Sequence, residues 1–432
     1  MLAIINATIV MRDHLIPEGT ILIDGQEIFA FGKAKDIEIP KDAEIIDAEG
    51  HYVGPGLIDI HTHAADNKWL FECPEETSKY MLQHGVTGVL TALYYNLNKQ
   101  GYLNAIDVVV NSYKEGKFKN FLGLYMEGPY LNPNFGCDRE KNTWKGEIKK
   151  EDYIEVVEKA KDYARVWAIA PERKGIDQFV KDVKNANNNA IFAVAHSEAT
   201  PAQIEKFIPY GLKIGTHHTN ATGTIFKYSE CRGVCVDETV NYNRDIYAEI
   251  ISDKMGLHVD PYMQRLVRRI KGDDKVILIS DQFVCDGPIP KGYEEATDIH
   301  FDFAGEIAGS GLTLDIACAN FMIHTGCSIS DAFNFASYNP AKCLGIADKY
   351  GSIREGNIAN LIIIDGKFNV KKVILKGELQ WTKYLNLQQL LPLSRQTMCH
   401  LKTESFAKKL ERSVELTLKN VKLGIIQNST LK

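Results

Sequence analysis

The stretch Gly54-Pro55-Gly56-Leu57-Ile58-Asp59-Ile60-His61-Thr62-His63 decides the fold, because a turn leads into an apolar strand that ends in two histidines. Successive side chains of a strand point to opposite faces, so His61 and His63 project from the same face. Imidazole is the commonest metal ligand among side chains, and two on one face can bind one ion. Such pairs also arise by chance, so the metal site needs support from the rest of the chain.

The composition is that of an ordinary globular protein. The chain has 432 residues, 45% hydrophobic and 25% charged, which is enough for one large core and a smaller second one. The net charge of −6 argues against nucleic acid or an anionic membrane as the main partner. We find no run of about 18 apolar residues and no signal-peptide pattern, and nine scattered cysteines suit a reducing compartment. We therefore expect a cytoplasmic protein.

Both ends of the chain contain short strands joined by tight turns. Residues 1–53 include Asp24-Gly25, a dipeptide that favours a hairpin, and residues 347–384 include the apolar runs Ala359–Ile364 and Lys372–Leu375. A β-unit of either size alone is too small to be stable. We therefore expect the two ends to pair into one small β-sandwich domain.

Residues 385–432 form a C-terminal helical tail in this interpretation. Phe406, Leu410, Val414, Leu418 and Val421 recur every three or four residues and give one apolar stripe. We expect the stripe to pack on the body of the protein or on a second subunit of a homodimer. Association with a membrane is the alternative, but the stripe is narrow and no lipid-anchor motif accompanies it.

Between the two ends, residues 54–346 alternate short apolar runs with amphipathic helical stretches. This alternation is typical of an α/β protein with a parallel sheet. About eight strand–helix units fit a (β/α)₈ TIM-type barrel better than an open sheet. The expected strands are Leu57–His61, Gly88–Leu93, Phe121–Met126, Val166–Ala170, Ala190–Ala195, Lys213–Gly215, Lys275–Ile279 and a segment before Gly309.

A barrel of this kind carries its chemistry at the C-terminal ends of its strands. Five of the expected strands end in such groups, namely His61 with His63, Glu127, His196, His217 and Asp281. One such residue alone is most often a cap or a surface group, but coincidence does not explain five. Histidine nitrogens and a carboxylate oxygen suit Zn²⁺, with Fe²⁺ or another first-row ion as alternatives, and leave one position for water. Asp281 is then the natural general base for metal-assisted hydrolysis.

The order of these residues resembles the amidohydrolase superfamily, and further motifs resemble its N-acetylglucosamine-6-phosphate deacetylase family. The motifs are Glu127-Gly-Pro-Tyr-Leu-Asn-Pro133, His196-Ser-Glu-Ala-Thr200, Thr216-His-His-Thr-Asn-Ala221 and Asp253-Lys-Met-Gly-Leu-His-Val-Asp-Pro261. Together they are specific, although each one alone is weak. The resemblance implies an enzyme that hydrolyses the acetamide of an amino-sugar phosphate, converting N-acetylglucosamine 6-phosphate to glucosamine 6-phosphate and acetate.

The resemblance also implies a role for each of these residues. Glu127, His196 and His217 would hold the principal ion. His61 and His63 would be available to a second ion that shares Glu127. Asp281 would be the general acid and base, and the contacts to the sugar phosphate would come from Asn220, Ala221 and His258.

The chain departs from this family on the substrate side. After the Glu-Gly-Pro motif the family commonly has a Lys-Gly-Ala-His run, which is replaced here by Asn134-Phe-Gly-Cys-Asp138. Neither Lys227 nor Arg232 stands in the family's context for its phosphate-binding arginine, so the basic residue that a phosphate needs stays open. Two other hypotheses remain: an amidohydrolase for a different amide or a cyclic imide, and a non-catalytic regulatory protein on the same scaffold. Every expected metal ligand is present in the sequence, which argues against a non-catalytic protein.

Overall fold

The structure, a computed structural model, describes residues 1–137, 139–223 and 226–382. The apolar stripe predicted for the C-terminal tail lies outside the described residues. Among the helices of the described part of the chain, none is both long and apolar enough to cross a membrane.

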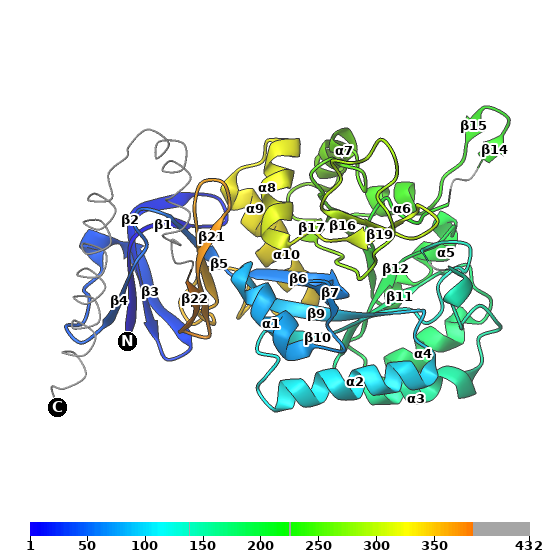
Figure 1. Cartoon of the computed structure of the whole chain (residues 1–432), viewed down its shortest axis with the longest axis horizontal. Helices are drawn as coiled ribbons and strands as arrows, with labels where there is room; N and C mark the ends of the chain where they lie inside the picture. The colour runs from blue at the N-terminus through cyan, green and yellow to red at the C-terminus, as the bar shows by residue number, and fades with distance from the viewer. Residues whose placement is uncertain (138, 224–225, 383–432) are drawn as a thin grey trace, which may run out of the picture. The chain divides into compact units, whose positions relative to one another are not determined.

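The central sheet is a nearly closed parallel barrel of eight strands, surrounded by helices (Figure 1). Neighbours in the sheet follow the order of the chain, as expected when each strand returns through a helix. The barrel strands are β6 (Leu57–Thr62), β9 (Val86–Tyr94), β10 (Phe121–Glu127), β11 (Ala164–Ile169), β12 (Ile191–Val194), β13 (Leu212–Gly215), β16 (Tyr247–Ile251) and β17 (Val276–Ile279). The predicted fold class is confirmed.

Helices around the barrel contribute buried apolar side chains to the same core as its strands. In α4 (Ile176–Ala186), the buried Phe179, Val180 and Val183 share one side of the helix. The start of α7 (Pro261–Lys271) is fixed by Asp260, whose carboxylate accepts a hydrogen bond from the Tyr262 backbone N–H at 2.7 Å. The other helices are α1 (Pro74–Gln83), α2 (Lys99–Lys114), α3 (Lys150–Ala160), α5 (Pro201–Glu205), α6 (Val236–Tyr242), α8 (Leu314–Thr325), α9 (Ile329–Phe333) and α10 (Asn339–Leu344).

The sequence-based expectation is wrong for one barrel strand. The segment before Gly309 forms β19 (Ile307–Ser310), which pairs with β18 (Ile299–Phe301) in a separate hairpin. The place between β13 and β17 in the barrel belongs instead to β16. Glu249 stands in the middle of β16, and a charged residue inside so short a run hides a buried strand from pattern analysis.

Both chain ends contribute to a second, mixed sheet, as predicted. The order is β22-β21-β20-β5-β1-β2-β3, with β4 on β1, and Figure 1 shows the early and late strands side by side. Its strands are β1 (Leu2–Val10), β2 (Leu15–Asp24), β3 (Glu27–Lys33), β4 (Glu44–Asp47), β5 (Tyr52–Pro55), β20 (Leu361–Ile364), β21 (Val370–Leu375) and β22 (Glu378–Thr382). Ile4, Val53 and Ile363 belong to an apolar cluster separate from that of the barrel. The exact domain boundaries stay a prediction.

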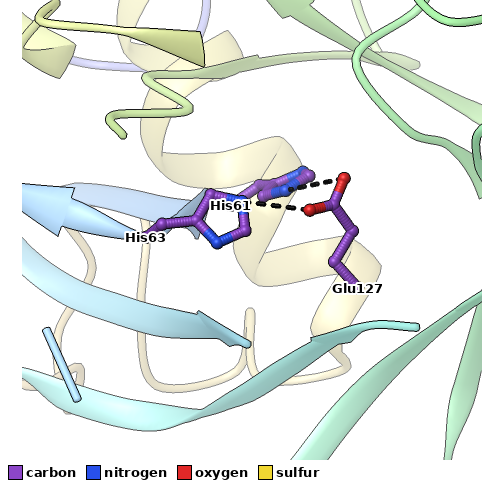
Figure 2. A group of neighbouring side chains, drawn as sticks. All are labelled: His61, His63 and Glu127. Carbon is purple, nitrogen blue, oxygen red and sulfur yellow. Dashed lines mark ion pairs between the residues drawn. The ribbon is translucent and has the colours of Figure 1, made fainter. Parts of the chain in front are cut away.

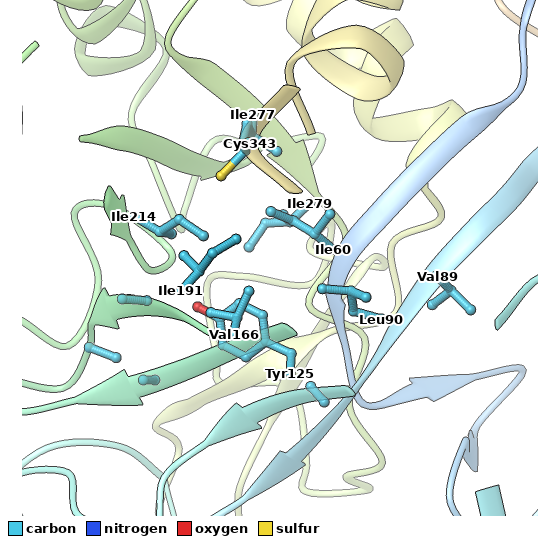
Figure 3. Packing of buried hydrophobic residues seen from close by; sticks show 14 of the residues in the cluster. Ile60, Val89, Leu90, Tyr125, Val166, Ile191, Ile214, Ile277, Ile279 and Cys343 are labelled. Carbon is cyan, nitrogen blue, oxygen red and sulfur yellow. The ribbon is translucent and has the colours of Figure 1, made fainter. Parts of the chain in front are cut away.

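Apolar side chains fill the interior of the barrel. Ile60, Val166 and Ile279 are fully buried and lie in one cluster (Figure 3). Tyr125 joins them, and its hydroxyl lies 2.7 Å from that of Thr216. Because a packed barrel is not a pore, chemistry is confined to the ends of its strands.

Individual hydrogen bonds connect β6 and β17, the first and last strands of the barrel sheet. The backbone N–H of Asp281 donates to the carbonyl oxygen of His61 at 3.0 Å, and the Ser280 hydroxyl donates to Asp59 Oδ2 at 2.6 Å. Burial raises the pKa of Asp59 to about 7, although its hydrogen bond with Ser280 acts in the opposite direction. These bonds bring the ends of β6 and β17 together at one side of the barrel.

Candidate metal centre

The structure brings all the predicted strand-end residues to the C-terminal side of the barrel. His196, His217 and Asp281 follow β12, β13 and β17, with positive φ angles of 42°, 30° and 49°. Residues other than glycine adopt such angles at a cost of about 1–3 kcal/mol, and the strain tends to gather at functional sites. The backbone conformation therefore marks three of the five strand ends that the sequence pattern selects.

Glu127, at the end of β10, is the centre of the group. Its Oε2 lies 3.0 Å from His63 Nε2, an ion pair drawn in Figure 2. Its Oε1 lies 2.9 Å from His196 Nε2 and 3.2 Å from His217 Nε2. Burial alone would raise the pKa of this carboxyl, but the hydrogen bonds with His196 and His217 hold it well below its usual range. Glu127 is therefore ionised and available as a ligand.

The side chains form two overlapping sets of three, and each set could hold a metal ion. One set is Glu127, His196 and His217, and the other is His61, His63 and Glu127; within a set the ligand atoms lie within 4.8 Å of one another. In the second set, His61 Nε2 is buried without a hydrogen-bond partner among the described residues. Two histidines and a glutamate also form a donor set of known zinc enzymes. The residues present therefore fit a divalent metal centre.

Asp281 stands beside the second set. Its Oδ1 lies 3.5 Å from His63 Nε2 and 3.7 Å from His61 Nε2. The carboxylate also faces the cavity described below, with its side chain 12% exposed. Asp281 therefore lies next to the candidate metal ligands and lines the cavity above them.

A cavity of about 260 Å³ lies over these groups, and the predicted substrate contacts Asn220, Ala221 and His258 line it as well. His258 Nδ1 lies 3.3 Å from Asp253 Oδ2, which orients the ring. His258 Nε2 is buried and has no hydrogen-bond partner among the residues that the structure describes. Since buried polar atoms are almost always paired, His258 is placed to bind a polar group of a ligand.

Glu249 belongs to the site although the sequence analysis did not select it. It is fully buried on β16, and its Oε2 lies 3.1 Å from His61 Nδ1 and accepts the backbone N–H of His217 at 3.2 Å. Glu249 Oε2 can accept an N–H from His61 Nδ1, and that hydrogen bond would leave Nε2 of the ring for a metal. Glu249 could have been found from the sequence because it lies inside the apolar run Tyr247–Ile251. A charged residue in a buried strand needs a partner, which points to a site nearby.

The two basic residues considered for a phosphate are not among those that line the cavity. Arg232 lies on the hairpin of β14 (Phe226–Tyr228) and β15 (Cys231–Arg232), with its side chain 72% exposed and 2.6 Å from Glu238. Lys227 lies on the same hairpin and is exposed. The short pair β7 (Ala64–Ala65) and β8 (Lys68–Trp69) follows His63 directly.

The chain is similar to known amidohydrolases over most of its length. The model of the amidohydrolase family matches residues 52–379. An N-acetylglucosamine-6-phosphate deacetylase of Bacillus subtilis is 25% identical over 401 residues, which cover 88% of this chain and 96% of the relative. An N-acetylgalactosamine-6-phosphate deacetylase of Escherichia coli O157:H7 is 26% identical over 381 residues, covering 85% and 97%. The crystal structure of the N-acetylglucosamine-6-phosphate deacetylase of Pasteurella multocida superposes with a TM-score of 0.75 at 25% identity, covering 88% and 100%.

We expect His196→Ala or His217→Ala to empty the first ligand set and abolish turnover, because each removes one of three donors. Elemental analysis of the purified variants measures the metal content per chain. His218→Gln is the matched control, because His218 Nε2 lies 3.2 Å from Asn241 Oδ1 and is not part of either set. Full metal content and normal turnover in His217→Ala would show that the ligand assignment is wrong.

Joint replacement of His61 and His63 by alanine distinguishes one ion from two. If the second set binds its own ion, the wild type holds two ions per chain and the double variant retains one. Unchanged stoichiometry in the double variant would rule out the second ion.

Glu249→Leu should weaken metal binding at the second set roughly 10- to 100-fold, the usual effect of losing a partner that orients a ligand. Glu249→Gln should recover most of the affinity, because its amide oxygen can still accept from His61. Metal titration followed by calorimetry measures both, and thermal denaturation reports any loss of folding. Equal affinities in the wild type and in Glu249→Leu would refute the orienting role.

Proposed function

The chain belongs to the amidohydrolase family, and on that premise we propose that it is a metal-dependent deacetylase. Its proposed reaction is the hydrolysis of N-acetylglucosamine 6-phosphate to glucosamine 6-phosphate and acetate. Relatives that cover most of the chain carry that activity in their names. The observation that carries the proposal is the single carboxylate of Glu127 shared by two histidine pairs, with Asp281 beside it in the same cavity.

The ligands are proposed from the same geometry. Glu127, His196 and His217 hold the principal ion, and His61 and His63 complete a second site with Glu127. Zn²⁺ is the proposed metal because of the nitrogen-rich donor set, and Fe²⁺ or another first-row ion is the alternative. The homodimer and the cytoplasmic location expected from the sequence remain part of the proposal.

The chemistry requires one proton to leave water and one to reach the amide nitrogen, while a carbon–oxygen bond forms and the carbon–nitrogen bond breaks. A divalent ion held by Glu127, His196 and His217 would supply Lewis-acid chemistry, which polarises a carbonyl and lowers the pKa of a water. Asp281 accepts the proton of that water and delivers it to the departing nitrogen, because an amine anion is too poor a leaving group. Asn220 and His258 line the cavity and hold the sugar in place.

The proposal is tested by measuring acetate release from a panel of substrates. We expect turnover of N-acetylglucosamine 6-phosphate, and the panel includes N-acetylgalactosamine 6-phosphate because one relative carries that name. N-acyl amino acids and cyclic ureides represent the second candidate, an amidohydrolase for another amide or cyclic imide, which the altered segments 134–138 and 222–232 favour. Turnover of those compounds without release of acetate from either sugar phosphate would replace the proposed function by that candidate.

We expect Asp281→Asn to keep the metal and to lose roughly 10²–10⁴ in kcat, the usual contribution of general acid–base catalysis. Asparagine fills the same space and can still form hydrogen bonds, but it cannot take up and return a proton near neutral pH. Single-turnover kinetics and elemental analysis measure the two quantities on one sample. If Asp281 only orders its loop, the variant will instead melt at a lower temperature while its folded fraction keeps normal kcat.

A further inference from the structure

The cavity over the metal centre is lined by several acidic groups and by few cationic ones. Its lining includes the carboxylates of Glu127, Asp281 and Glu306, and Arg139 is the one arginine or lysine among the described lining residues. A phosphate dianion entering such a cavity needs a fixed positive charge, and guanidinium groups bind phosphate through two parallel hydrogen bonds. Arg139 is therefore the lining side chain with the required charge and shape.

Arg139 is already held at the open side of the cavity by an ion pair. Its Nη2 lies 2.6 Å from Glu306 Oε1, and its Nη1 donates to the carbonyl oxygen of Asn134 at 3.4 Å. The side chains of Arg139 and Glu306 are 41% and 46% exposed, whereas that of Glu127 is 5% exposed. The cation of Arg139 thus lies closer to the solvent than Glu127, and both residues line the same cavity.

The pair also connects the two sides of the active site. Arg139 follows β10, the strand that ends in Glu127, while Glu306 lies in the turn between β18 and β19. The end of β19 is attached to the catalytic side, because the Ser310 backbone N–H donates to the carbonyl oxygen of Asp281 at 2.9 Å. The ion pair therefore joins the segment that follows β10 to the turn between β18 and β19, and both of its residues line the cavity.

We propose that Arg139 binds the phosphate of the substrate and that Glu306 holds Arg139 in position until the phosphate takes its place. This inference rests on the proposed function and assigns the basic residue that the function requires. An ion pair as exposed as this one contributes little to stability, so its exchange for a doubly charged phosphate is favourable. A substrate without a phosphate cannot make this exchange, which makes Arg139 a determinant of specificity.

Arg139 comes directly after segment 134–138, the stretch where the sequence departs from the pattern of the resembling family. The alternative cation, Arg232, has an ion pair of the same length, 2.6 Å to Glu238, but it does not line the cavity. Each arginine has an ion pair of 2.6 Å with a glutamate, but only Arg139 lines the cavity, so Arg232 is a suitable control.

The test compares the binding of glucosamine 6-phosphate and of glucosamine by calorimetry, so it does not depend on turnover. We expect the wild type to prefer the phosphorylated sugar and Arg139→Gln to lose roughly 10- to 100-fold of that preference, the effect of removing hydrogen bonds to a charged group. The preference of Arg139→Lys should lie between those of the wild type and Arg139→Gln. Lysine keeps the positive charge but cannot form the two parallel hydrogen bonds of a guanidinium group. Arg232→Gln is the control and should bind as the wild type does.

The same variants are then assayed for the KM of N-acetylglucosamine 6-phosphate, which should rise in Arg139→Gln by a similar factor. An unchanged preference in Arg139→Gln, no preference in the wild type, or a lost preference in Arg232→Gln would each overturn the assignment. Absence of acetate release from a wild type whose binding depends on Arg139 would instead refute the proposed function and leave the phosphate site standing.

Discussion

The join between the first and last strands of the barrel is the constraint on which the site depends. A parallel sheet brings the carboxyl ends of its strands to one side, but only the closure from β17 to β6 places Asp281 against His61 and His63. That closure uses the hydrogen bond of Ser280 to Asp59 in the buried interior. Asp59 in the first strand and the chemistry at the end of the last strand are thus parts of one structural unit.

Each carboxylate of the site lies beside at least one histidine ring. Glu249 lies behind His61, Glu127 lies between the histidine pairs, and Asp281 faces the cavity. Each buried carboxylate has an imidazole as a neighbour, which offsets the cost of removing a charge from water. A carboxylate behind a ligating imidazole also orients the ring, as Glu249 does for His61 through the contact at Nδ1.

The sequence revealed those parts of the fold and site that follow a regular pattern. His61, His196 and His217 could be found because each follows an apolar run, and the runs themselves gave seven of the barrel strands. β16 was not predicted because Glu249 interrupts its apolar run. For the same reason Glu249 was not predicted as a residue of the site. Arg139 follows no strand directly and belongs to no recurring spacing, so only the folded loops relate it to the cavity. Residues 385–432 lie outside the described part of the chain.

The mixed sheet has a consequence for how the chain is made. β5 passes into β6 through Gly56 alone, yet β5 pairs with β20, about 300 residues further along. β1, its other neighbour, is already made, but at about 5–20 residues per second β5 waits roughly 15–60 s for β20. An unpaired strand edge invites pairing with other chains. Because the sheet is complete only after the whole barrel has been synthesised, a prematurely terminated chain keeps the edge of β5 that pairs with β20 open.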